Sequence, residues 1–94
     1  MVIQELIDLN QGVIDACNVN AGILADLVTA EADYETAHGN LTNAIQAGNG
    51  VNTQAAWDAF EVARDARNAL IGQYRNSQAD VGQNCTDAFR VLAQ

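Results

Sequence analysis

The sequence contains no proline, four basic residues and a single histidine among its 94 residues. Without proline, no position in the chain is barred from the interior of a helix. The basic residues are all arginines, and the net charge is −8. Because proteins bind nucleic acid by neutralising phosphates with Lys and Arg, this composition argues against DNA or RNA as a partner. An anionic membrane surface is disfavoured for the same reason.

Features of export, catalysis and metal chemistry are also missing from the sequence. No basic segment followed by an apolar run begins the chain, and no uninterrupted apolar stretch approaches about 18 residues. We therefore expect a cytoplasmic protein that does not contact membranes. The two cysteines, Cys17 and Cys85, lack the C-x-x-C spacing of zinc and redox sites. His38 has no serine or cysteine beside it to activate, so we expect no enzyme activity and no cofactor.

What the chain does contain is a helix-forming composition, 49% hydrophobic with much of that alanine and only 5% aromatic. Before residue 47, apolar residues alternate at spacings of three and four for about six heptads, which is typical of a helix with one packing seam. Asn20 is the polar member of this first seam. Its positions are Leu6, Leu9, Val13, Ala16, Asn20, Ile23, Leu27, Ala30, Tyr34, Ala37, Leu41 and Ala44.

A second seam follows a segment rich in glycine and asparagine near the middle of the chain. Its positions are Phe60, Ala63, Arg67, Leu70, Tyr74, Ser77, Val81, Asn84, Ala88 and Val91. The pattern predicts a single all-α domain over residues 1–94, with a helix at about 2–46, a turn at 47–52 and a helix at about 53–92. Asn52 or Thr53 is the expected N-cap of the second helix.

Folding the two helices antiparallel about residue 50 predicts which side chains meet. Tyr34 lies opposite Arg67, and Asp33 is within reach of the same arginine. Cys17 and Cys85 are brought near one another, as two buried thiols in a reducing compartment. In an oxidising compartment they would instead close a disulfide, which leads to the alternative of a small secreted helical-hairpin interaction protein.

Apolar residues beside the two seams exceed what one partner helix covers, and they gather toward the end of the hairpin away from the turn. Such a surplus indicates an association surface, so we expect a homodimer that forms a four-helix bundle. The alternative is a compact monomeric bundle of four shorter helices, with breaks near residues 20 and 76, and a break near residue 39 is also open. The predicted interface residues are Ile7, Ile14, Leu24, Val28, Ile71, Phe89 and Leu92.

Glu35-Thr36-Ala37-His38 is a Glu-x-x-His tetrapeptide, which places a carboxylate and an imidazole on one helical face. It resembles the ligand motif of ferritin-like di-iron proteins. The resemblance implies a metal-binding hairpin as an alternative function. A surface histidine is the interpretation that we prefer, because no second such tetrapeptide is present. The ligand set under the alternative is Glu31, Glu35, His38, Glu61 and Asp65.

Taken together, the patterns favour a non-enzymatic helical protein that associates with itself and has a structural or adaptor role. Its expected partner is a second copy of the chain or another helical protein. This interpretation depends on the sustained heptads, the surplus of apolar positions and the missing catalytic cluster.

Overall fold

The computed structural model describes residues 2–93 and contains, within that range, two helices and no strand. Helix α1 spans Val2–Ala47 and helix α2 spans Gly50–Leu92. The prediction of an all-α helical hairpin is confirmed. Both helices run unbroken through residues 20, 39 and 76, so the alternative with four shorter helices is wrong.

The turn between the helices is shorter than predicted and consists of Gly48 and Asn49. Gly48 has a φ of 72°, a left-handed conformation that ends α1 and that glycine adopts without a Cβ penalty. The side-chain Oδ1 of Asn49 accepts from the backbone N–H groups of Val51 at 3.1 Å and Asn52 at 3.2 Å. Asn49 is therefore the N-cap of α2, and the prediction that placed the cap at Asn52 or Thr53 is wrong.

Thr53, in the first turn of α2, links the two helices through its hydroxyl group. Its hydroxyl lies 3.2 Å from the carbonyl oxygen of Ala44 and 2.8 Å from that of Asn49. The contact with Ala44 joins the beginning of α2 to the end of α1, where helical carbonyl groups lack partners inside their own helix. The bend is thus fixed by one glycine conformation, one side-chain cap and one hydroxyl.

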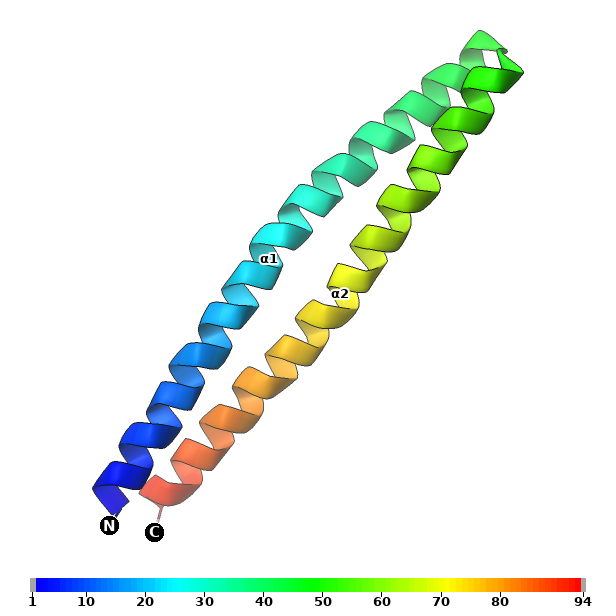
Figure 1. The fold of residues 1–94 in the computed structure, drawn as a ribbon. Helices are drawn as coiled ribbons and strands as arrows, with labels where there is room; N and C mark the ends of the chain where they lie inside the picture. The colour runs from blue at the N-terminus through cyan, green and yellow to red at the C-terminus, as the bar shows by residue number, and fades with distance from the viewer. Residues whose placement is uncertain (1, 94) are drawn as a thin grey trace. The chain divides into compact units, whose positions relative to one another are not determined.

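The chain divides into two units, each of which contains a segment of both helices. The bend unit, Ala25–Ile71, consists of the end of α1, the turn and the beginning of α2. The terminal unit combines the chain up to Leu24 with the chain from Gly72 onward. Within each unit the α1 and α2 segments run antiparallel, cyan to yellow in the bend unit and blue against orange and red in the terminal unit (Figure 1).

Both predicted seams are confirmed as the contact lines of the hairpin. Every seam position of α1 and of α2 is at least partly buried, while most positions beside the seams are exposed. The most buried seam residues are Ala30 and Leu41 in the bend unit and Ser77 and Val91 in the terminal unit, each 6–8% exposed. No described side chain is less than 2% exposed, so the seams form a shallow core with apolar side chains left at its edges.

Candidate association surface

One flank of the terminal unit carries most of its exposed apolar side chains. A groove lined by Leu6, Ile7, Asn10, Ala88 and Leu92 opens on this flank. A second groove is lined by Cys17, Asn20, Gln78, Val81 and Gly82. Heptad spacing from these lining residues places further positions on the same flank. We call this surface the apolar flank, and it consists of Ile3, Ile7, Ile14, Cys17, Leu24, Cys85, Phe89 and Leu92.

Five of the seven predicted interface residues belong to the apolar flank, and all five are exposed. The exposed fractions are Ile7 55%, Ile14 44%, Leu24 42%, Phe89 73% and Leu92 64%. The other two lie in the bend unit, where Val28 is exposed and Ile71 is partly buried. The apolar flank is therefore a candidate association surface that contains the part of the predicted set lying in the terminal unit.

The opposite flank of the terminal unit is acidic. Its groove is lined by Asp15, Ala16, Val19, Ser77, Asp80 and Asn84. Asp8 and Asp87 lie one heptad from Asp15 and Asp80 on the same faces of α1 and α2. We call this surface the acidic flank. None of the residues that define the apolar flank is acidic, so the two flanks of one unit differ sharply in charge.

The two cysteines are free and exposed, so the prediction of buried thiols is wrong. Gly12 of α1 lies against Asn84, because a Cβ at Gly12 would come within 2.9 Å of the Asn84 Oδ1. Cys85 is therefore level with Gly12 or its neighbour, and Cys17 is about five residues, or about 7 Å, further along α1. Packed helix axes lie about 8–10 Å apart, so the two Cα atoms exceed the roughly 7 Å limit for a disulfide.

Asn20 is the one seam residue of α1 with an unmatched polar group. Among the described residues that are not exposed, its Nδ2 is the buried side-chain nitrogen that has no hydrogen-bond partner. A buried donor without an acceptor costs about 1–3 kcal/mol. The seam of the terminal unit therefore contains a destabilising position beside the groove that Cys17 lines.

The bend unit holds the ion pair of the seam, between the Arg67 Nε and the Glu31 Oε2. The Arg67 guanidinium also lies over the Tyr34 ring, 5.0 Å from its centroid, as the predicted pairing of these residues requires. The carboxylate predicted to reach Arg67 was that of Asp33, and that prediction is wrong. Because the turn lies at Gly48 and Asn49 rather than at residue 50, the glutamate one half-turn earlier meets the arginine. The hydrogen bond with Glu31 raises the pKa of Arg67, and burial opposes that shift.

Phe60 is the centre of an aromatic cluster in the bend unit. Its ring centroid lies 5.3 Å from Tyr34, 5.8 Å from Trp57 and 6.0 Å from His38. The Trp57 Nε1 donates to the Glu61 Oε1 at 2.6 Å. Trp57 itself is 43% exposed, so it covers Phe60 from the surface and is not a core residue. The cluster stabilises the hairpin near its turn.

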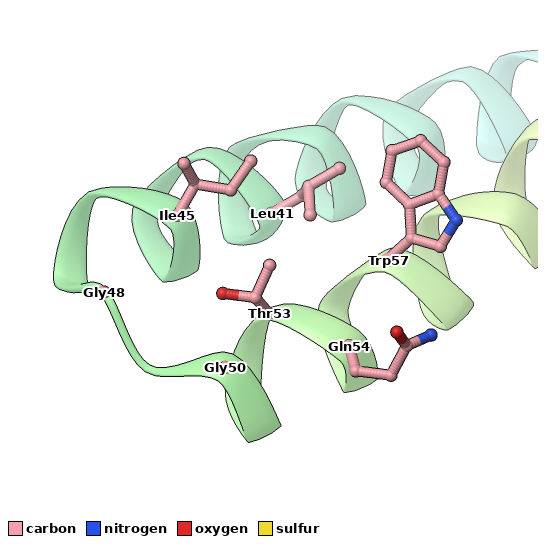
Figure 2. Close-up of a pocket in the computed structure, with 7 residues that line it drawn as sticks. All are labelled: Leu41, Ile45, Gly48, Gly50, Thr53, Gln54 and Trp57. Atoms are coloured by element: carbon pink, nitrogen blue, oxygen red, sulfur yellow. The ribbon is translucent and has the colours of Figure 1, made fainter.

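A shallow groove lies at the bend, between the last turns of α1 and the first turns of α2 (Figure 2). Leu41 and Ile45 of α1 and Trp57 of α2 supply its apolar wall. The two polar side chains in its lining are bonded within the unit, Thr53 to backbone carbonyls and Gln54 Nε2 to the Asp58 Oδ1 at 2.9 Å. The groove therefore offers a ligand mainly apolar contact.

The ligand set implied by the Glu-x-x-His resemblance is not gathered into a site. Glu31 pairs with Arg67, Asp65 with Arg64 at 3.3 Å, and Glu61 accepts from Trp57. His38 and Glu35 are exposed, and the His38 ring lies against Phe60. Across residues 2–93, no three His, Cys, Asp or Glu side chains are placed to share a metal ion.

Helix α1 differs from expectation in its hydropathy. The segment Ile3–Ala47 contains an 18-residue window that is apolar enough, and poor enough in charged residues, to cross a membrane by length and composition. A search for uninterrupted apolar runs misses this window, because apolar residues alternate with small polar ones along the helix. In the structure the most apolar line of α1 is its seam, which packs against α2.

Comparison with known proteins identifies no relative of this chain. The chain matches no protein-family model, and it matches no curated protein and no solved structure.

Proposed function

We propose that this protein is a non-enzymatic helical hairpin that associates with a second copy of itself through the apolar flank, in a structural or adaptor role. The observation that carries the proposal is the exposure of Ile7, Ile14, Leu24, Phe89 and Leu92 on one flank of the terminal unit. Exposed apolar side chains grouped on one surface are typical of an interaction site, whereas isolated ones are not.

The charge distribution favours a second copy as the occupant of this surface. Two copies of a chain with a net charge of −8 repel one another over most of their surfaces. The apolar flank is a surface on which they can meet without opposing carboxylates, because its residues include no Asp or Glu. A two-fold dimer pairs the same patch on both copies, and an apolar patch without carboxylates is complementary to itself.

The polar groups of the chain support a role in association rather than catalysis. The one histidine lies against Phe60, and two carboxylates of the bend unit, Glu31 and Glu61, are engaged by Arg67 and Trp57. None of the apolar window of α1 is buried in the isolated hairpin, but its seam lies against α2 and its exposed isoleucines supply the apolar flank, which a second copy would cover. We therefore favour a partner helix over a bilayer as the environment of α1.

Sedimentation equilibrium in the presence of reductant tests this proposal. We expect the wild-type chain to be a dimer at high concentration and to dissociate on dilution. Ile7→Glu places a carboxylate on the apolar flank and is expected to abolish the dimer. Val19→Glu is the matched control, since Val19 is 59% exposed on the acidic flank and Ile7 is 55% exposed.

Circular dichroism of both variants reports whether helix content survives the substitution. Loss of the dimer in Ile7→Glu alone, with or without loss of helix, supports the proposal. A wild-type chain that sediments as a monomer at every concentration contradicts it. Equal loss of the dimer in both variants also contradicts it, because the apolar flank would then have no special part in association.

A further inference from the structure

Cys17 and Cys85 are both exposed, and both belong to the apolar flank. Cys17 lines the groove that Gln78, Val81 and Gly82 form on α2. Cys85 lies one heptad after Gln78 and one heptad before Leu92, so it is on the same face of α2 as the linings of both grooves. Two thiols of one chain therefore open onto the surface at which we propose that two copies meet.

The geometry of the terminal unit keeps these thiols from bonding to each other within one chain. The contact between Gly12 and Asn84 sets the register, and it displaces Cys17 from Cys85 by about 7 Å along the helices in addition to the spacing between them. A disulfide needs Cα atoms within roughly 7 Å. The thiols of one copy are accessible to a second copy, and the register of the two helices keeps them too far apart for an intrachain disulfide.

We propose that the cysteines of the apolar flank form a disulfide between two copies, which converts the self-association into a covalent dimer. The inference rests on the proposed function, because the thiols lie on the surface at which we propose that two copies meet. The partner is a second copy of this chain, and the oxidant is a small disulfide such as oxidised glutathione. The apolar flank is then a surface whose association responds to the thiol–disulfide balance around it.

The chemistry proceeds by two thiol–disulfide exchanges. The thiolate of one copy attacks oxidised glutathione, forms a mixed disulfide and releases one molecule of glutathione as its thiol. The thiolate of the second copy then attacks the protein sulfur of that mixed disulfide and releases the second glutathione thiol. In sum, two protein thiols are oxidised to one disulfide, and one oxidised glutathione is reduced to two glutathione molecules.

Association raises the rate of the second exchange. In a solution of about 10 µM protein, a non-covalent dimer presents the second thiol at an effective concentration on the order of 1 mM, roughly a hundredfold higher. A thiol on a surface that does not take part in association lacks this advantage. Cross-linking is therefore expected to depend on which flank carries the cysteine.

The test treats the wild-type chain with oxidised glutathione and follows the product by non-reducing electrophoresis and intact mass. A matched control carries Val19→Cys in a Cys17→Ser, Cys85→Ser background, which moves an exposed thiol to the acidic flank. We expect the wild type to form a covalent dimer that reductant reverses, at a rate on the order of a hundredfold above the control. The single variants Cys17→Ser and Cys85→Ser identify the bonded positions, and at least one of them is expected to lose the product.

Two results overturn the inference. One is a monomer lighter by two hydrogen atoms, which is the mass of an intrachain disulfide. The other is cross-linking of the wild type no faster than that of the Val19→Cys control. Sedimentation under reductant separates this failure from failure of the proposed function. A non-covalent dimer that does not cross-link refutes the disulfide alone, whereas a reduced chain that remains monomeric refutes the self-association.

Discussion

The bend unit and the terminal unit are built from the same two helices, but they differ in whether the polar side chains of the seam have partners within the unit. The bend unit places Leu41, Tyr34, Phe60 and Arg67 in its seam and pairs Arg67 with Glu31. The seam of the terminal unit contains Asn20, Ser77 and Asn84, and the Nδ2 of Asn20 has no partner.

This difference shows where the hairpin is stabilised from within. In the bend unit, aromatic contacts, an ion pair and a capped turn hold the two helical segments together. In the terminal unit the seam contains Asn20, Ser77 and Asn84, and apolar side chains accumulate on one flank. A region of this kind gains most from a partner, because association buries the side chains that its own seam does not.

The largest effect is expected from truncation of the bend-unit seam. Leu41 is 6% exposed, and Leu41→Ala removes buried carbon atoms and leaves a cavity, which lowers the free energy of unfolding by about 2–3 kcal/mol. Val91→Ala in the terminal unit, also at 6% exposure, removes two carbon atoms where Leu41→Ala removes three, and is expected to cost about 1–2 kcal/mol. Urea unfolding at one fixed protein concentration measures both. A larger loss for Val91→Ala would reverse the comparison between the units.

The second prediction removes the unmatched polar group of the terminal unit. Asn20→Leu replaces a buried nitrogen that lacks a partner with apolar contact, so we expect the free energy of unfolding to rise by about 1–2 kcal/mol. A single polar seam residue also fixes register and partner number, so sedimentation of the variant is expected to reveal a broader range of oligomers.

Asn18→Leu is the control for this change, since Asn18 is exposed on the same helix. An exposed substitution is expected to alter stability by less than about 0.5 kcal/mol. If Asn20→Leu destabilises the chain, or gives the same dimer as the wild type, then Asn20 is neither a destabilising position nor the residue that fixes partner number.

The third prediction concerns the turn that closes the bend unit. Gly48 has a φ of 72°, and Gly48→Ala forces a side chain into a left-handed conformation at a cost of about 1 kcal/mol. Gly50→Ala is the neighbouring control, because a Cβ at Gly50 meets nothing within 4 Å and the residue begins a helix. Urea unfolding is expected to give a loss for Gly48→Ala and none for Gly50→Ala. Equal effects would mean that the turn conformation contributes little to the bend unit.

Most of the fold could be predicted from sequence because heptad spacing persists over tens of residues. The seam positions from Leu6 to Ala44 repeat with the helical period, so the spacing alone predicts which residues face the partner helix and are partly buried. The position of the turn within Ala47–Thr53 could not be predicted to the residue, since several glycines and asparagines there suit a cap. The choice of Gly48 and Asn49 changed the partner of Arg67 and separated the thiols, because register follows from the turn.

The exposure of the residues on the candidate association surface was predictable in outline and not in detail. Apolar positions beside a seam can be read from a helical wheel, so Ile7, Ile14 and Phe89 were identified as exposed. Partial burial of Ile71 depends on how neighbouring side chains of α2 pack, which no periodic pattern contains. The exposure of both cysteines also depends on side-chain packing at the edges of the seam, because both positions lie beside it rather than on it.

The smallest effect tests the packing of the terminal unit at its closest contact. Gly22→Ala meets nothing within 4 Å, so it is expected to stabilise α1 by about 0.4–1 kcal/mol through the lower entropy of the unfolded chain. Gly12→Ala brings the same entropic gain, but its Cβ would lie 2.9 Å from the Asn84 Oδ1, which must move. The Asn84 Nδ2 donates to the Asp80 carbonyl oxygen at 2.8 Å, so that movement strains a hydrogen bond.

We expect Gly12→Ala to gain roughly 0.5 kcal/mol less in free energy of unfolding than Gly22→Ala, and Asn84→Ala to remove the difference. If the two glycine variants are equally stable, Asn84 is not held against α1, and the register that separates Cys17 from Cys85 is looser than the structure indicates.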